Sequence, residues 1–215
     1  MQEVRLFFAK QDRGVYISHL DMVRSVARGL SRAKIKVKYT QGFNPIPYLV
    51  FGQPLSLGYA GAREVCDFTI ISDDIKVKDV APILASFMPE ALQPIESIAP
   101  KSKIGAIAKA EYTVKLKSVT SISQAEMADF LGSSEIIVLK KTKRGEAMTN
   151  IVPFIHKIEM ADNMTIKCIL SASSGESLNP SYLINALNQQ FATAGFGWEE
   201  ITRERLLLAD GSDFS

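Results

Sequence analysis

The sequence has 215 residues, 47% of them hydrophobic and 22% charged, which is enough for one large or two small globular domains with a proper core. It contains no apolar run near ~18 residues and no basic-then-apolar signal segment, so we expect neither a membrane span nor secretion. Cys66 and Cys168 lie far apart without metal-like spacing, and the chain has only two histidines, which argues against a structural zinc site. We expect reduced, buried thiols, no metal, no cofactor and a cytoplasmic location.

The net charge of +2 is unevenly distributed. Residues 1–50 hold nine Lys or Arg against three Asp or Glu, a local charge of +6, so the remainder carries −4. A basic N-terminal segment on a nearly neutral chain indicates either a local anionic partner, most commonly nucleic acid, or simply a solvated surface.

The first half of the chain predicts the order strand, helix, strand, strand, helix, strand. Residues 4–8 are aromatic or β-branched and indicate a strand, and the 3–4 apolar spacing over 19–33 indicates a helix. Alternation predicts a strand over 34–40, whereas the Gly- and Pro-rich stretch 42–61 predicts an irregular loop. The remaining predictions are a strand at 65–71, a helix at 77–88 with Pro82 in its first turn, and a strand at 92–98.

The second half repeats this order after residues 101–110, which we interpret as a linker. The predicted strands cover 111–117, 135–141, 150–160, 164–171 and 198–208, with a turn at 161–163. The predicted helices cover 123–131 and the segment from Pro180 to before Gly195, where Asn179 is the N-cap. The sequence therefore predicts an α+β fold of two tandem ferredoxin-like (βαββαβ) domains with antiparallel sheets, at residues 1–100 and 111–215.

The segment Tyr16-Ile17-Ser18-His19-Leu20-Asp21 opens the first predicted helix. Ser18 followed by Asp21 is typical of a helix N-terminus, because the serine hydroxyl accepts from the third helical N–H and the carboxylate complements the helix dipole. Helix capping therefore accounts for Ser18 and Asp21, but not for His19. His19 falls at the edge of the apolar face, where it either packs against a strand or exchanges a proton at a site mouth, and Tyr16 could share that face.

Basic residues follow along the same helix and the next predicted strand. They are Arg24, Arg28, Arg32, Lys34, Lys36 and Lys38. The arginines are successive i+4 neighbours, of which Asp21 can pair with the first, and the lysines alternate toward one face. Such a stripe suits phosphate contacts, and a solvated surface would show the same pattern.

The loop at 42–48 combines a flexible glycine, two prolines and two aromatic residues, with Phe43 beside Asn44. Aromatic side chains near basic residues can stack on exposed bases, and they can equally pin a loop to the core. A second basic stretch at 140–145 predicts a hairpin tip, for which a solubilising turn is the simpler interpretation. The sequence has no Gly-rich phosphate loop, nucleophile elbow or clustered acidic metal site, and His156 lies among apolar residues, as a structural histidine would.

Several of these motifs occur together in one known family. They are Tyr16-Ile17-Ser18-His19-Leu20-Asp21 with Arg24, Arg32-Ala33, Gly42-Phe43-Asn44-Pro45, and Pro54-Leu55 with Leu57-Gly58. The chain thereby resembles the radical-SAM-linked proteins, an uncharacterised bacterial family. Weaker similarity extends to Ile201-Thr202-Arg203 and to Asn150-Ile151 with Pro153-Phe154-Ile155, where family members usually have Asp in place of Asn150. The resemblance implies a domain fused to, or encoded beside, radical SAM proteins. This chain has no three-cysteine motif, so it cannot hold their iron–sulfur cluster.

We therefore hypothesise a non-catalytic RNA-binding or substrate-presenting accessory module that serves a radical SAM protein. Its RNA- or anion-binding residues would be Tyr16, Arg24, Arg28, Arg32, Lys36, Lys38, Phe43 and Asn44. One alternative is a metal-independent ribonuclease or RNA-modifying enzyme that uses His19 as its catalytic residue. Another is a protein-interaction domain without RNA binding.

Overall fold

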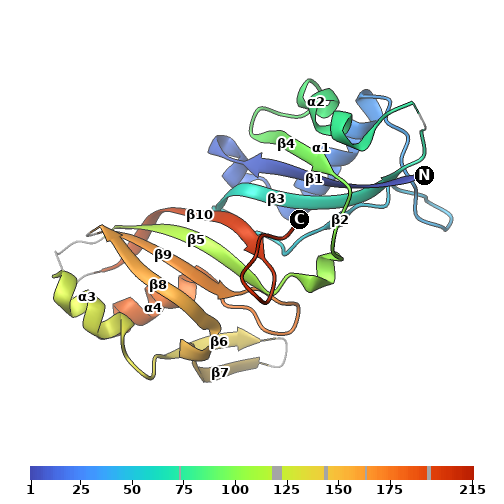
Figure 1. The fold of residues 1–215 in the computed structure, drawn as a ribbon. Helices are drawn as coiled ribbons and strands as arrows, with labels where there is room; N and C mark the ends of the chain where they lie inside the picture. Colours follow the sequence, from blue (N-terminus) through green and yellow to red (C-terminus); the bar gives the residue numbers. More distant parts are fainter. Residues whose placement is uncertain (73, 118–122, 143–144, 163, 193–194) are drawn as a thin grey trace. The chain divides into compact units, whose positions relative to one another are not determined.

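The computed structural model describes residues 1–215 except 73, 118–122, 143–144, 163 and 193–194 (Figure 1). The chain falls into two compact units, Met1–Ile107 with Arg205–Ser215 (unit 1) and Ala108–Glu204 (unit 2). Both units are mixed α+β structures, and the pairings described below are antiparallel. In the described part of the chain, no helix has both the length and the apolar character needed to cross a membrane.

Within the described part of residues 1–107, unit 1 contains four strands and two α-helices, in which the two-residue strand β2 takes the place of the strand predicted at 34–40. These elements are β1 (Gln2–Lys10), α1 (His19–Arg32), β2 (Val50–Phe51), β3 (Ala60–Ile70), α2 (Val80–Ala85) and β4 (Leu92–Ile98), with 3-10 turns at Asp12–Tyr16, Val77–Asp79 and Ile104–Ala106. The sheet has the order β4-β1-β3, and β2 pairs with β3. The two helices and β4 are confirmed, with Pro82 in the first turn of α2, as predicted.

The core of unit 1 lies between one face of this sheet and both helices. Alternate residues of β1, Val4, Leu6 and Phe8, are fully buried there. They pack in one cluster with residues of α1 such as Val26 and of α2 such as Leu84. Figure 1 shows α1 and α2 on the same side of β1, β3 and β4. The 3–4 apolar spacing of α1 thus fixes which helix face meets the sheet.

The predicted strand at 34–40 is wrong in type, although its alternation is real. Helix α1 ends in a Schellman motif, in which the Lys34 N–H donates to the Ser31 carbonyl and the Ile35 N–H donates to the Leu30 carbonyl. Lys34 takes the left-handed φ of 57° that this motif requires. The following residues form only isolated bridges, Val37 to Ile70 and Tyr39 to Pro47. A tight helix exit therefore leaves too little regular backbone for a strand.

The Gly- and Pro-rich loop is shorter than the predicted 42–61. It contains the two-residue strand β2, which pairs Val50 with Asp67 and Phe51 with Cys66. Strand β3 also begins at Ala60, five residues before the predicted start. The small residues at 60–62 gave no apolar alternation, and the strand forms there through pairing with β1.

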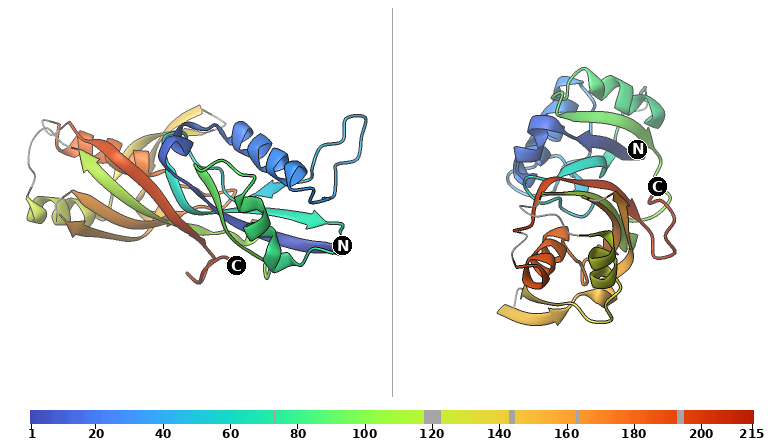
Figure 2. Two further views of the ribbon diagram at one scale, coloured as in Figure 1. Left: turned by 90° about the horizontal axis from the view of Figure 1, so that it is seen from above. Right: turned by 90° about the vertical axis from the view of Figure 1, so that its left-hand side faces the viewer.

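Unit 2 contains the remaining elements, except that the last three residues of β10, 205–207, belong to unit 1. They are β5 (Lys109–Lys117), α3 (Gln124–Leu131), β6 (Ile137–Thr142), β7 (Gly145–Asn150), β8 (Ile155–Asp162), β9 (Thr165–Ser171), α4 (Pro180–Gln190) and β10 (Gly197–Leu207), with a 3-10 turn at Val152–Phe154. Strands β10, β5, β9 and β8 are neighbours in that order, and β6 pairs with β7 in a separate two-stranded sheet. Both helices cover one face of the four strands (Figure 2).

Most of the second-half predictions are confirmed, and α3 starts with the capping box Ser123–Glu126. The predicted strand at 150–160 is divided into the end of β7, a 3-10 turn and β8. Asn163 of the predicted turn and Lys143 and Arg144 of the second basic stretch lie outside the described residues.

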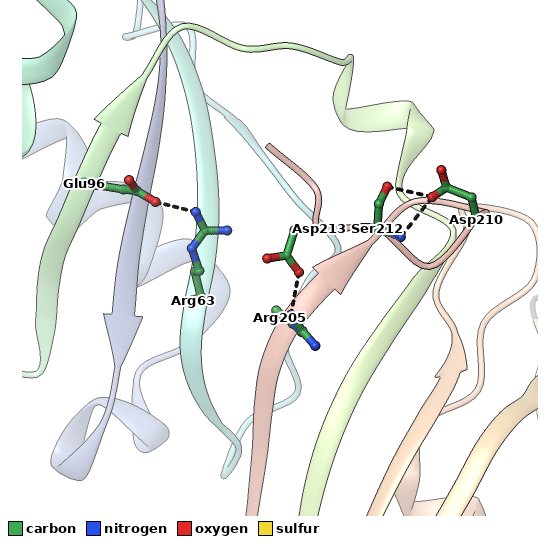
Figure 3. Close-up of polar contacts among 6 residues, drawn as sticks. All are labelled: Arg63, Glu96, Arg205, Asp210, Ser212 and Asp213. Carbon is green, nitrogen blue, oxygen red and sulfur yellow. Dashed lines mark hydrogen bonds and ion pairs between the residues drawn. The ribbon is translucent and has the colours of Figure 1, made fainter.

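Ion pairs and one buried arginine line the sheet face of unit 1 that is turned away from the helices. Arg5 is fully buried and donates to both carboxylate oxygens of Asp67, at 2.9 and 2.7 Å. Arg63 pairs with Glu96, and its guanidinium lies 3.5 Å from the centroid of the Phe7 ring. Figure 3 shows this pair together with the Arg205–Asp213 pair near the C-terminus. These contacts join β1 to β3 and β3 to β4, and the last one joins β10 to the C-terminal segment.

Candidate nucleic-acid interface

Ser18 and Asp21 are engaged in capping α1. The Ser18 hydroxyl accepts from the Asp21 N–H at 3.2 Å and donates to the Asp21 carboxylate at 2.8 Å. Arg24 donates to the same carboxylate at 3.1 Å. The hydrogen bond from the Ser18 hydroxyl makes the largest contribution to lowering the pKa of Asp21, and the hydrogen bond from Arg24 makes the next largest. The Asp21 charge is therefore used locally, and Arg24 is partly neutralised.

His19 is the first residue of α1 and its side chain is exposed. Its ring lies edge-to-face against Phe51 of β2, with ring centroids 5.4 Å apart. Phe51 in turn contacts the fully buried Phe8. In the part of the chain that the structure describes, no hydrogen bond to the His19 ring is formed. Tyr16, in the preceding 3-10 turn, is 77% exposed.

The remaining predicted cations are all exposed. They are Arg28, Arg32, Lys34, Lys36 and Lys38. Among the described residues, none of these five forms an ion pair. Between the lysines, Ile35 and Val37 are buried at 3% exposure and pack into the core of unit 1. The backbone of this segment is thus fixed while the lysine side chains project into solvent.

A hairpin-like loop, residues 38–48, follows the basic segment. The Tyr48 N–H donates to the Lys38 carbonyl and the Thr40 N–H donates to the Ile46 carbonyl, which closes a tip at 41–45. At the tip, the Phe43 side chain is fully exposed, and Asn44 is also exposed. The left view of Figure 2 shows the segment after α1 projecting away from the sheet of unit 1.

The structure brings only some of the predicted site residues together. His19 contacts Phe51 and the lysine segment leads directly into the loop, whereas no recorded contact joins His19 to any of the cations. Leu20, which the helical pattern assigns to the apolar face, is 56% exposed, and Leu57 is 63% exposed. Both residues belong to the family motifs, but their exposure could not be predicted, since no local pattern marks an apolar residue as exposed.

The described residues of unit 2 show no comparable cluster. Lys140 donates to the Ser177 carbonyl at 2.7 Å and lies over the Phe154 ring, and Lys141 pairs with Glu146. The His156 ring nitrogen Nε2 lies 3.0 Å from the Ser171 hydroxyl. Burial is the main cause that lowers the pKa of His156, and the positive charge of Lys109 lowers this pKa further. Across the described parts of the chain, no group of three His, Cys, Asp or Glu side chains could hold a metal ion.

Residues 3–180 match the family described as "Uncharacterized protein conserved in bacteria (DUF2344)". The chain belongs to this family. The matched region contains the entire candidate interface, from Tyr16 to Tyr48. The DUF2344 assignment itself names no radical SAM protein. No curated protein matches the chain in sequence.

Three of the solved structures that this chain resembles are the following. One, titled "Crystal Structure of a Cbf5-Nop10-Gar1 Complex", matches with a TM-score of 0.53 and 8% identity over 94% of this chain and 48% of that chain. A second is the "archaeal box H/ACA sRNP Nop10-Cbf5 complex", with a TM-score of 0.49 and 10% identity over 94% of this chain and 47% of that chain. A third is an "H/ACA RNP bound to a substrate RNA", with a TM-score of 0.49 and 9% identity over 88% of this chain and 44% of that chain. This DUF2344 chain thus spans about half the length of the chains it matches, and the similarity shows the fold alone.

Proposed function

We propose that this chain is an RNA-binding accessory module whose interface comprises α1, the lysine segment and the 38–48 loop. The observation that carries the proposal is the fully exposed Phe43 at the tip of a loop whose base is fixed beside the lysines. Exposed aromatic rings next to unpaired cations are the combination that binds single-stranded RNA, through base stacking and phosphate contact.

The charges of the interface predict how strongly binding depends on salt. Within the described residues, five cations of the interface form no ion pair, and these are Arg28, Arg32, Lys34, Lys36 and Lys38. If each neutralises one phosphate of a single strand, log K falls with log salt at a slope of about −3.5. Raising salt from 50 to 200 mM then weakens binding by about 100-fold.

Fluorescence anisotropy of a labelled single-stranded RNA across a salt series tests this proposal. We expect the variant Lys34→Gln, Lys36→Gln, Lys38→Gln to reduce the slope by about two. The matched control replaces three exposed lysines elsewhere, Lys78→Gln, Lys117→Gln and Lys167→Gln, with the same change in net charge. Equal effects of the two triple variants, or no binding at low salt, would overturn the proposal.

Two further parts of the proposal are the fold of each unit and the identity of the protein partner. In unit 1 the strand order β4-β1-β3-β2, and in unit 2 the order β10-β5-β9-β8, support two ferredoxin-like arrangements, the second with β6 and β7 inserted. The sequence motifs support a radical SAM protein as the partner. Co-purification of such a protein with the wild-type chain, lost when Tyr16 and Leu20 are replaced by Ser, would support that partnership.

His19 separates this module from the enzymatic alternative. Its ring contacts the apolar Phe51 and, among the described residues, forms no hydrogen bond that would position it as a general base. We expect His19→Ala to leave RNA affinity within about threefold, and RNA cleavage that depends on His19 would instead establish the enzyme.

A further inference from the structure

A cavity of about 350 Å³ opens on the sheet face of unit 1 turned away from the helices, and all of its lining residues belong to unit 1. Its polar lining comes from Glu3, Tyr48, Asp67, Thr69, Ser102 and Lys103. Its apolar lining comes from Val4, Val50, Phe68, Pro100 and Ile104. The cavity thus combines apolar walls with convergent polar groups, and small-ligand sites use both kinds of lining.

The back of the cavity is held rigidly by Arg5. This residue donates to both oxygens of Asp67 and, at 2.7 Å, to the Ser102 carbonyl, and its guanidinium stacks over the Phe214 ring at 4.0 Å. The Arg5 Nη1 is the one buried side-chain nitrogen or oxygen without a hydrogen-bond partner in the described residues. Asp67 is therefore fixed in orientation, and each of its oxygens retains a lone pair for a second donor.

The opening of the cavity is rich in hydrogen-bond acceptors. Glu3 pairs in register with Thr69, and Arg5 pairs with Asp67 two residues further along β1, so the Glu3 and Asp67 carboxylates lie on the same sheet face. Glu3 is exposed and makes no recorded hydrogen bond or ion pair within the described residues. A ligand that offers two adjacent N–H donors would satisfy the Glu3 carboxylate bidentately.

The cavity borders the interface at Lys38, whose backbone is hydrogen-bonded to two residues that line the cavity. The Lys38 N–H donates to the Thr69 carbonyl, and the Lys38 carbonyl accepts from the Tyr48 N–H. Both of these neighbours line the cavity. An RNA strand held by Lys36 and Lys38 would therefore pass beside the cavity, where the half-exposed Tyr48 ring offers a stacking surface.

We infer that the cavity binds one unstacked guanine base. This inference rests on the proposed function, because the base would arrive on an RNA strand bound at the interface. Guanine presents its N1–H and N2–H donors side by side, which a single carboxylate accepts together, whereas adenine and uracil do not. Glu3 reads this edge, Tyr48 stacks on the ring, and Lys103 contacts the adjoining phosphate.

Anisotropy with four single-stranded RNAs tests the inference on the full chain. They are oligouridine and the same strand with one central guanine, adenine or inosine. We expect the guanine strand to bind at least about tenfold more tightly than the other three, since inosine lacks the N2 amine. Glu3→Gln should abolish this preference while leaving the affinity for oligouridine within twofold. Glu90→Gln, an exposed carboxylate elsewhere in unit 1, is the charge-matched control.

The outcomes separate this inference from the proposed function. Equal affinity for all four strands would overturn the guanine cavity while leaving the RNA interface intact. If no strand binds, the proposed function fails, and titration with guanosine 5′-monophosphate decides the cavity. Binding of that nucleotide, lost in Glu3→Gln, would assign the cavity to a free nucleotide, and absence of binding would overturn it.

Discussion

Replacing the buried Arg5 by methionine should destabilise unit 1 substantially. The change removes two hydrogen bonds to Asp67 and one to the Ser102 carbonyl, all between 2.7 and 2.9 Å. It leaves a carboxylate without its counter-ion and a carbonyl without its donor, and such unpaired groups cost far more than the net value of the original bonds.

The size of this effect follows from the burial of the two partners. Breaking a fully buried pair costs ~3–5 kcal/mol. The Arg5 side chain is fully buried, but the Asp67 side chain retains 19% exposure, so water can partly solvate the carboxylate once Arg5 is gone. We therefore expect Arg5→Met to lower the free energy of unfolding by about 2–4 kcal/mol. The double variant Arg5→Met, Asp67→Asn should recover about 1–2 kcal/mol of that loss.

Urea unfolding followed by far-UV circular dichroism measures these changes. Arg63→Met is the control, because Arg63 also pairs with a carboxylate and stacks on a phenylalanine, but its pair with Glu96 is 27% and 46% exposed. That variant should cost only about 1 kcal/mol. Equal losses for Arg5→Met and Arg63→Met, or no recovery in the double variant, would refute the assignment of Arg5 as a buried structural charge.

Four further predictions concern the interface and the thiols. Lys34→Gly should weaken RNA binding, because it removes a cation of the interface. It should not lower the free energy of unfolding in urea, because glycine adopts the left-handed φ of 57° without strain. A decrease in the free energy of unfolding above ~1 kcal/mol would contradict this. Phe43→Ala should leave stability unchanged, since the ring is fully exposed, and should weaken RNA binding by about 5- to 100-fold in anisotropy if the ring stacks on a base. Burial raises the pKa of Cys168 to about 12 and that of Cys66 well above its usual range, so neither thiol should react with a disulfide reagent at pH 8 before unfolding. Because the folded chain keeps thiol protons that the unfolded chain releases, stability should fall as pH rises above ~8.5, and a flat profile would count against buried thiols.

Three of the four described α-helices were predictable because each carries its own start signal, whereas α2 has no side-chain cap. Ser18 before α1, the Ser123–Glu126 pair before α3 and Asn179-Pro180 before α4 all precede apolar residues at 3–4 spacing. Local hydrogen bonds therefore fix these boundaries without help from distant residues.

What the sequence could not predict depends on distant contacts. Nothing local indicates that Arg5 is buried, because its partners Asp67, Ser102 and Phe214 come from three other segments. The cavity cannot be predicted from the sequence for the same reason, because its lining residues come from distant segments of the chain. The grouping of residues 205–215 with unit 1 likewise has no local signal. The alternation over 34–40 correctly predicts that Ile35 and Val37 are buried, but Tyr39 is 49% exposed. The bridges of this segment depend on pairing with Ile70 and Pro47.

The lysines of the interface have a competing explanation, which is protection of a strand edge against aggregation. That explanation requires an open edge. The Lys36–Lys38 backbone is instead bonded to β3 on one side and to Tyr48 on the other, so the lysines guard no free edge at this position. Edge protection would also disfavour the fully exposed Phe43 and the 60% exposed Ile46 a few residues away. A surface that presents cations and apolar rings together, on a backbone anchored by Ile35 and Val37, is better explained by a ligand that needs both.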